Sequence, residues 1–129
     1  MNLTRRQLLK RSAVAGVSLT LPTGLTSRVL GANEQVRIGV IGLGNRGNAH
    51  IDWFGELAGV KIAAICDPDQ ARLDSAKKKA ADAKAYTDLR KLLDDQTIDA
   101  VVIATCNHWH CLAAIWACQA GKDVYVEKP

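Results

Sequence analysis

The chain has 129 residues, 48% of them hydrophobic, which suits a single domain with a substantial core. Its net charge of +4 comes from the first 32 residues, which hold five basic residues and no acid, while the remaining 12 basic and 13 acidic residues nearly balance. Because that remainder is close to neutral and the chain has only one Phe and two Tyr, we expect no nucleic-acid partner.

The first segment, residues 1–32, has the composition of a targeting sequence. The stretch TRRQLLK contains the pair Arg5 and Arg6 and resembles the twin-arginine export signal, with Leu8 where the commonest form has Phe. The apolar stretch that follows is too short and too mild for a stable membrane span. We therefore expect a twin-arginine signal peptide, recognised by the twin-arginine export machinery, and a periplasmic location. The alternative is an amphipathic N-terminal helix whose arginines occur by chance.

From Val36 onward, apolar runs alternate with amphipathic segments. Continuous apolar runs are typical of strands that are buried on both faces of a sheet, whereas short runs with turn residues at their ends are weaker strands. The strands that we predict cover residues 36–42, 60–67, 83–87, 98–105 and 123–127.

Four helices are predicted between these strands from their apolar periodicity and their end residues. The first covers 45–59 with Ala49, Trp53 and Leu57 inward, and ends at Gly59; the second covers 68–82 with Leu73, Ala76 and Ala80 inward. A short helix after Thr87 or Asp88 turns Leu89, Leu92 and Leu93 inward, and the last covers 110–121 with Leu112, Ile115 and Trp116 inward and Gly121 as its stop.

The alternation of strands and helices with short loops predicts an α/β fold with a doubly wound parallel sheet of the Rossmann type. The expected strand order is 3-2-1-4-5, and the expected domain covers residues 34–129. Five strands and four helices are close to a nucleotide-binding domain that lacks the end of its second half, so we expect a C-terminally incomplete domain.

The stretch GLGNRG places Gly42, Gly44 and Gly47 in GxGxxG spacing. Three such glycines are common in turns, but here they directly follow a buried strand and open a helix, which is the context of a dinucleotide-binding loop. We expect the helix N-terminus to bind a pyrophosphate, with additional donors from Asn45 and Arg46. The alternative is a packing turn with no ligand.

Asp67 ends the second predicted strand, 20 residues after Gly47. A carboxylate at this position accepts hydrogen bonds from the ribose hydroxyls of the adenosine half and repels a 2′-phosphate, so NAD is favoured over NADP. The alternative is that Asp67, Pro68 and Asp69 only begin the next helix. The two interpretations are compatible if Asp67 positions the turn while Asp69 caps.

The stretch TCNHWH, residues 105–110, lies at the carboxyl end of a strand, where open α/β sheets bind ligands. Thr105 and Asn107 are candidates for the cofactor cleft. His108 and His110 are either part of this site or helix-capping and core histidines, and their spacing is poor for a shared metal ion. We therefore expect no metal site.

The four cysteines, Cys66, Cys106, Cys111 and Cys118, contain no CxxC pair. In the expected strand order, one strand separates the strands that end near Cys66 and Cys106, so two strand spacings of about 9.6 Å lie between them. This exceeds the reach of a disulfide, about 7 Å. Cys111 and Cys118 lie two turns apart on one helix, roughly 10 Å by rise alone. We therefore expect no disulfide in either pair.

Four stretches together, GVIGLGNRG, ICDPD, TCNHWH and AGKDVYVEKP, resemble the Gfo/Idh/MocA family, the glucose–fructose oxidoreductase and inositol dehydrogenase group. The resemblance covers about residues 34–129. Cys106 stands where the family usually has proline, which leaves Asn107 and His110 in place.

This resemblance implies that Lys128 is the catalytic lysine beside the nicotinamide, that Glu127 orients it and that Pro129 fixes the turn. It also implies a following α+β domain that binds substrate and is absent from this chain, and a homo-oligomer at full length. The expected activity is an exported NAD-dependent oxidoreductase acting on a sugar or cyclic polyol, with this chain alone inactive. One alternative is a glycosidase of the same family that uses NAD without net redox change. Another is a non-catalytic nucleotide-binding or oligomerisation module.

Overall fold

The computed structural model describes residues 35–128; the expected signal peptide and Pro129 lie outside the described residues. No helix in the described part of the chain has the length and apolar character needed to cross a membrane. The elements, in chain order, are β1 (Val36–Ile41), α2 (Asn45–Gly55), β2 (Val60–Cys66), α3 (Gln70–Lys77), β3 (Lys84–Tyr86), α4 (Leu89–Leu93), β4 (Ala100–Ile103), α5 (Asn107–Gln119) and β5 (Asp123–Val126).

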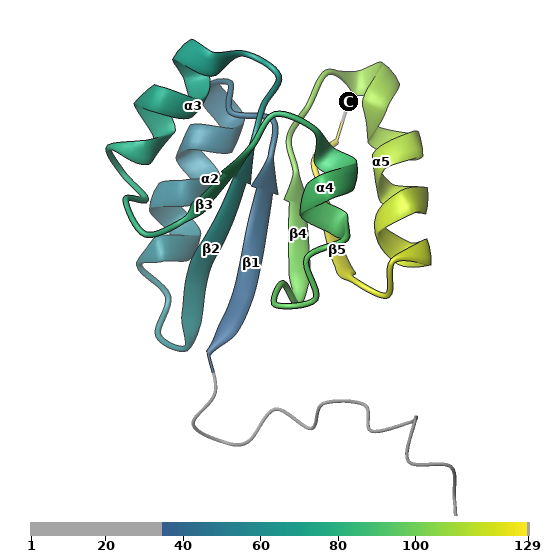
Figure 1. Cartoon of the computed structure of the whole chain (residues 1–129), viewed down its shortest axis with the longest axis horizontal. Helices are drawn as coiled ribbons and strands as arrows, with labels where there is room; N and C mark the ends of the chain where they lie inside the picture. Colours follow the sequence, from purple (N-terminus) through teal and green to yellow (C-terminus); the bar gives the residue numbers. More distant parts are fainter. Residues whose placement is uncertain (1–34, 129) are drawn as a thin grey trace, which may run out of the picture.

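The five strands form one parallel sheet in the order β3-β2-β1-β4-β5, which confirms the predicted fold class and strand order (Figure 1). β1 lies at the centre, between β2 and β4. Because all strands are parallel, the loops that follow their carboxyl ends meet at one edge of the sheet, at the top in Figure 1. The residues after β1, β2, β4 and β5 are therefore brought together from distant parts of the sequence.

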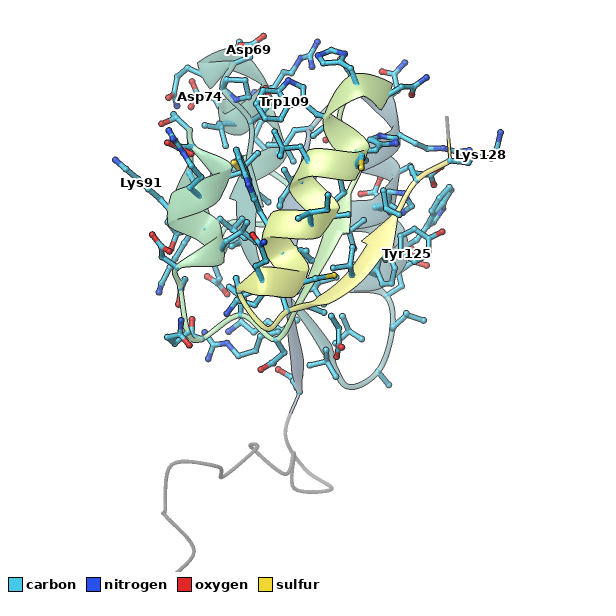
Figure 2. The ribbon with its side chains drawn as sticks, turned by 90° about the vertical axis from the view of Figure 1, so that its right-hand side faces the viewer. Asp69, Asp74, Lys91, Trp109, Tyr125 and Lys128 are labelled. Carbon is cyan, nitrogen blue, oxygen red and sulfur yellow. The ribbon has the colours of Figure 1, made fainter. Side chains whose placement is uncertain are left out.

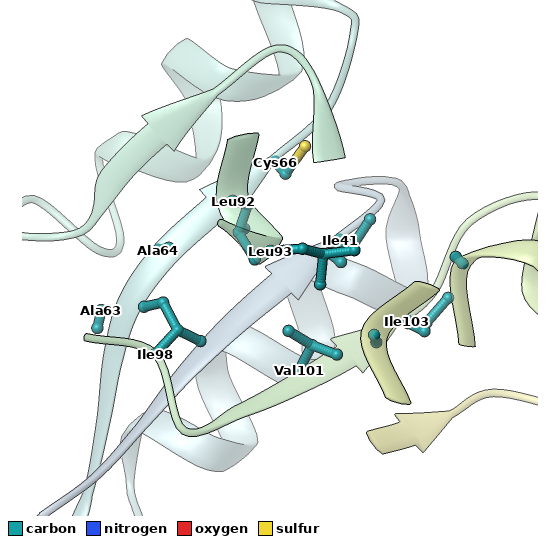
Figure 3. Packing of buried hydrophobic residues seen from close by; sticks show 11 residues of the cluster. Ile41, Ala63, Ala64, Cys66, Leu92, Leu93, Ile98, Val101 and Ile103 are labelled. Carbon is teal, nitrogen blue, oxygen red and sulfur yellow. The ribbon is translucent and has the colours of Figure 1, made fainter. Parts of the chain in front are cut away.

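Helices cover both faces of the sheet, with α2 and α3 on one face and α4 and α5 on the other (Figure 1). On the second face Leu92 and Leu93 of α4 pack against Ile41, Val101 and other buried side chains, as Figure 3 shows. Leu92 is completely buried. Truncating such a leucine to alanine typically costs about 2–5 kcal/mol of stability, so this short helix is fixed by its packing.

The predicted inward face of α2 is wrong. Trp53 and Leu57 are each 52% exposed, and the buried residues of the helix are Gly47, His50 and Ile51. Gly47 lies in close contact with Gly42, in the turn that follows β1. This contact orients α2 so that the residues three and four positions after Gly47 face the sheet. The helix also ends at Gly55, so Leu57 lies beyond it, and Gly59 adopts a positive φ of 80° in the turn before β2.

The predicted start and inward face of α5 are also wrong. The helix begins at Asn107 rather than at residue 110, and it buries Ala113 and Ala117 while Leu112 and Ile115 are exposed. Of the predicted inward residues only Trp116 packs against the core, where it is partly buried. Alanines four apart share one side of a helix, and their small side chains allow α5 to pack close to the sheet.

The second predicted helix is longer than α3, which begins at Gln70 after the N-cap Asp69. Its predicted inward residues Leu73 and Ala76 are buried. The predicted strands match β1 to β5 to within two residues at each end.

Candidate functional site

The three glycines of the β1–α2 loop serve different geometric needs. Gly42 has a φ of +89°, and a Cβ atom there would lie 2.7 Å from the backbone nitrogen of Thr105. A Cβ atom on Gly47 would lie 1.8 Å from the carbonyl oxygen of Gly42. At Gly44 the nearest atom to such a Cβ is Nη1 of Arg72, at 3.9 Å, so the backbone there is open toward the adjoining cleft. Gly42 and Gly47 therefore allow close packing, and Gly44 leaves room for a ligand.

The N-terminus of α2 faces this cleft with its backbone N–H groups. Gly44 is the N-cap residue and supplies no side chain to them, and the first turn contains no acidic residue. The side chain of Asn48 instead donates to the carbonyl oxygen of Leu43 at 2.7 Å and stabilises the loop. The first N–H groups of a helix have no intrahelical acceptor and carry a partial positive charge, so this end suits a diphosphate.

Asp67 connects the glycine loop to the loop after β2. Its carboxylate is 4% exposed, and Oδ2 accepts a hydrogen bond from the N–H of Leu43 at 2.7 Å. Oδ1 accepts from the N–H of Asp69 at 2.9 Å, while Asp69 itself caps α3 by accepting from Ala71. This confirms that Asp67 positions the turn while Asp69 caps the helix.

A cleft of about 560 Å³ extends along the carboxyl edge of the sheet, from the loop after β2 to the loop after β4. Its lining includes Gly44, Asn45, Arg46, Asp67 and Thr105, so most of the predicted cofactor residues lie around one cavity. Trp109 and Asp69, both labelled in Figure 2, mark this end of the molecule. An extended dinucleotide fits this arrangement, because the cavity joins an anion-binding helix end to a buried carboxylate.

Cys66 also lines the cleft, but its thiol is not a reactive group. Burial, together with the negative charges of Asp67 and Asp88, raises the pKa of Cys66 to about 12. The thiolate is the nucleophilic form of cysteine, so at neutral pH Cys66 is an inert packing residue. In the described residues all four cysteines are free.

A second, polar pocket of about 280 Å³ adjoins the cleft. Its polar lining comes from α2, the loop after β4, the first turn of α5 and the residues after β5, and comprises Arg46, Thr105, Asn107, His110, Glu127 and Lys128. Arg46 and Thr105 line both cavities, so the two cavities are neighbours. The structure thus places all of the predicted site residues after β4 and β5 in one pocket.

The two histidines of TCNHWH lie in different places. His110 is 9% exposed, and its Nε2 lies 2.9 Å from the carbonyl oxygen of Thr105, so it fixes the loop and also lines the polar pocket. His108 is exposed and lines the larger cleft beside Trp109. His110 is therefore a buried residue that fixes a loop, and a role of either histidine in the site stays a prediction.

Glu127 has a partner that was not expected. Its Oε1 lies 3.0 Å from Nε2 of His50 and 3.7 Å from Nε of Arg46, whereas the resemblance implied that it orients Lys128. Lys128 is exposed and lies at the edge of the molecule, where it borders the polar pocket (Figure 2). His50 is 1% exposed and was missed by the sequence analysis. Its only signal in the sequence is a polar residue three positions after Gly47, on the face that Gly47 holds against the sheet.

A family model described as an oxidoreductase family with an NAD-binding Rossmann fold matches residues 36–129. The chain belongs to the Gfo/Idh/MocA family. The described residues of this Gfo/Idh/MocA protein therefore form an NAD-binding Rossmann domain, in agreement with the fold and cofactor that the sequence predicted.

Relatives of the Gfo/Idh/MocA chain include glycosyl hydrolases and inositol dehydrogenases. It is 43% identical over 105 residues to the alpha-N-acetylgalactosaminidase of Shewanella oneidensis and 42% identical to a glycosyl hydrolase family 109 protein of another Shewanella strain. It resembles the solved scyllo-inositol dehydrogenase of Lactobacillus casei (TM-score 0.71, 31% identity) and myo-inositol dehydrogenase from the same organism in complex with NAD(H) and myo-inositol (TM-score 0.70, 35% identity). Each match covers 74% of this chain but only 23% of the two Shewanella proteins and 29% of the two dehydrogenases.

Proposed function

We propose that the chain is the cofactor-binding part of an NAD-dependent oxidoreductase that acts on a sugar or cyclic polyol. The observation that carries this proposal is that the dinucleotide-sized cleft and the polar pocket with Lys128 share Arg46 and Thr105. When bound, NAD supplies hydride acceptance and donation at its nicotinamide ring. The residues of this chain bind the cofactor and orient the polar groups beside it.

In the cleft, the open backbone at Gly44 and the N-terminus of α2 bind the diphosphate, with Asn45 and Arg46 beside them. Asp67 binds the ribose hydroxyls of the adenosine half through the acceptor sites that its bonds to Leu43 and Asp69 leave free. Its negative charge repels a 2′-phosphate, so NAD is the preferred cofactor over NADP.

In the polar pocket, Lys128 is the group that contacts the reacting oxygen of the substrate. An ammonium group polarises a carbonyl oxygen, and a lysine whose pKa is lowered by its surroundings also passes a proton. Asn107 and His110 lie in the same pocket and offer hydrogen bonds to substrate hydroxyls or to the nicotinamide amide.

The test compares Lys128→Met with the unchanged protein, at the length of its relatives. We expect calorimetry to show NAD affinity within about two-fold of the original, because the variant leaves the cleft intact. NADH formation from inositols and sugars is expected to be lost. Turnover that survives the substitution would remove Lys128 from the reaction, and absent NAD binding by either protein would refute the function as a whole.

A second candidate function is supported by the 43% identity to an alpha-N-acetylgalactosaminidase. A glycosidase with tightly held NAD would hydrolyse a glycoside with no net change in the redox state of the cofactor. Release of sugar from a nitrophenyl glycoside without consumption of added NAD identifies this function. Stoichiometric NADH formation identifies the dehydrogenase.

We also propose that residues 1–32 are a twin-arginine signal peptide, so that the protein is exported to the periplasm after folding with its cofactor. The support is the pair Arg5 and Arg6 in a segment without acidic residues. The complete enzyme is proposed to be a homo-oligomer, which light scattering of the purified protein tests.

A further inference from the structure

We propose that His50 is a positioning residue, which fixes the carboxylate of Glu127 in the polar pocket so that Glu127 contacts the nicotinamide end of bound NAD. This inference rests on the proposed function, because it requires the nicotinamide to lie in the polar pocket. His50 itself lines neither cavity and acts through Glu127.

The contact between the two residues joins distant parts of the chain. His50 lies in the middle of α2 and Glu127 directly follows β5, 77 residues later, yet Nε2 and Oε1 are 3.0 Å apart. The backbone of Glu127 is fixed separately, since its N–H donates to the carbonyl oxygen of Ile103 at 2.9 Å. With the backbone held by β4, the bond to His50 selects the direction of the side chain.

The ring of His50 is enclosed by three aromatic side chains. The centroids of Trp53 and Tyr125 lie 5.4 Å from that of His50, both in edge-to-face geometry, and Phe54 lies at 5.8 Å. Tyr125 and Lys128 are labelled in Figure 2 on the side of the molecule where β5 ends. This packing holds the imidazole in one orientation, which makes it a rigid donor.

The hydrogen bond has a defined direction. An ionised carboxylate only accepts, so Nε2 of His50 carries the hydrogen that it donates to Glu127. The other nitrogen, Nδ1, is buried and has no hydrogen-bond partner among residues 35–128. In the part of the chain that the structure describes, the bond to Glu127 is therefore the one hydrogen bond of the His50 ring.

A buried, half-satisfied imidazole costs stability, so its presence calls for a function. An apolar residue of similar size would fill the same aromatic surroundings without leaving Nδ1 unpaired. The gain from histidine is the bond at Oε1 of Glu127, an atom that also lies 3.7 Å from Nε of Arg46. Oε2 takes part in neither contact and is the oxygen assigned to the nicotinamide end.

The test measures the affinity of the 129-residue chain for NAD and for ADP-ribose, which is NAD without the nicotinamide. The ratio of the two affinities reports the nicotinamide contact, whereas ADP-ribose alone reports the rest of the cleft. His50→Leu removes the donor and keeps an apolar side chain. His50→Asn keeps an amide that is too short to reach Glu127, and His50→Gln places an amide nitrogen at the reach of Nε2. Phe54→Leu is the matched control, because it changes the packing around the ring but keeps the donor.

We expect the unchanged chain to bind NAD more tightly than ADP-ribose, and the ratio of the two affinities to fall about ten-fold in His50→Leu and His50→Asn, as expected when one charge-assisted contact is lost. His50→Gln and Phe54→Leu should retain the ratio, and all variants should bind ADP-ribose equally. Thermal unfolding identifies any variant that fails to fold. If His50→Leu fails to fold, the comparison of His50→Asn with His50→Gln tests the inference.

Three results would overturn the inference. An unchanged ratio of NAD to ADP-ribose affinity in folded His50→Leu or His50→Asn would show that His50 only packs. A fall of this ratio in His50→Gln as large as in His50→Asn would show the same. Equal binding of NAD and ADP-ribose by the unchanged chain would show that Glu127 makes no nicotinamide contact, although the cleft would still bind the adenosine half. Absence of binding to both ligands would refute the proposed function itself.

Discussion

A Cβ atom on Gly47 would lie 1.8 Å from the carbonyl oxygen of Gly42. Any side chain at position 47 would clash with this oxygen. Only glycine therefore allows the first turn of α2 to lie this close to the end of β1. The contact sets which face of α2 is buried, and with it the position of His50.

We therefore expect Gly47→Ala to destabilise the protein by about 1–3 kcal/mol, because the helix must move away from the loop to admit the methyl group. Gly55→Ala in the same helix is the matched control, since nothing lies within 4 Å of a Cβ there. The control should be neutral or stabilising by about 0.5–1 kcal/mol, because alanine favours helix. Urea unfolding of both variants measures the difference. Equal stability of the two would contradict the close packing at Gly47.

Asp67→Ala is expected to weaken NAD binding by roughly 1–3 kcal/mol through the loss of charge-assisted hydrogen bonds. It should also reduce the preference for NAD over NADP. The same change removes the acceptors of Leu43 and Asp69, so the melting temperature should also fall. Asp67→Asn is the control, because its amide oxygen keeps one backbone bond without the charge. Calorimetry with both cofactors measures the effect, and unchanged affinity for each would place Asp67 outside the binding site.

Asp95 should make stability depend on acid pH. Hydrogen bonds from Lys84, Thr97 and Tyr86 lower the pKa of its carboxyl below the usual range, although burial opposes the shift. The contribution of the Asp95 carboxylate to stability is therefore fully present above its pKa in the unfolded chain, about 3.9. It is lost as the pH falls from that value through the lower pKa of Asp95 in the folded protein.

Asp95→Asn should be less stable at neutral pH and should lose less stability on acidification than the unchanged protein. Denaturant unfolding at a series of pH values tests this, with the exposed neighbour Asp94→Asn as control. Parallel pH curves for the protein and Asp95→Asn would show that the carboxyl group makes no such contribution.

The export proposal predicts that Arg5→Lys combined with Arg6→Lys abolishes periplasmic accumulation while the folded domain keeps its melting temperature. The receptor for this signal recognises the arginine pair, so conserving the charge does not rescue export. Cell fractionation measures the location. Normal amounts of the double variant in the periplasm would indicate the general secretory route or the absence of a signal.

Sequence reasoning predicted the parts of this molecule that depend on local pattern. The apolar run of β1 followed by Gly42, Gly44 and Gly47 has one common structural meaning, and Asp67 follows from it by position. Parallel topology with right-handed connections then fixed the strand order.

The parts that were missed depend on tertiary contacts. The periodicity of α5 fits a face with Leu112 and Ile115 as well as one with Ala113 and Ala117, and only close approach to the sheet selects the alanines. The pairing of His50 with Glu127 requires β5 to lie beside the helix that follows β1, and no local signal encodes it. A site of this kind becomes visible only when the strand order is combined with the orientation of each helix.

The bond from the N–H of Leu43 to Asp67 has a kinetic consequence. Leu43 is 1% exposed, and its amide is bound to a carboxylate of the same chain. Because this bond lies within the chain and needs no ligand, we expect it to order the glycine loop before the cofactor binds, so that little backbone freedom is lost on binding. The amide of Leu43 should accordingly exchange its hydrogen with solvent slowly even in the free protein, and cofactor association should proceed in a single phase without a preceding loop rearrangement.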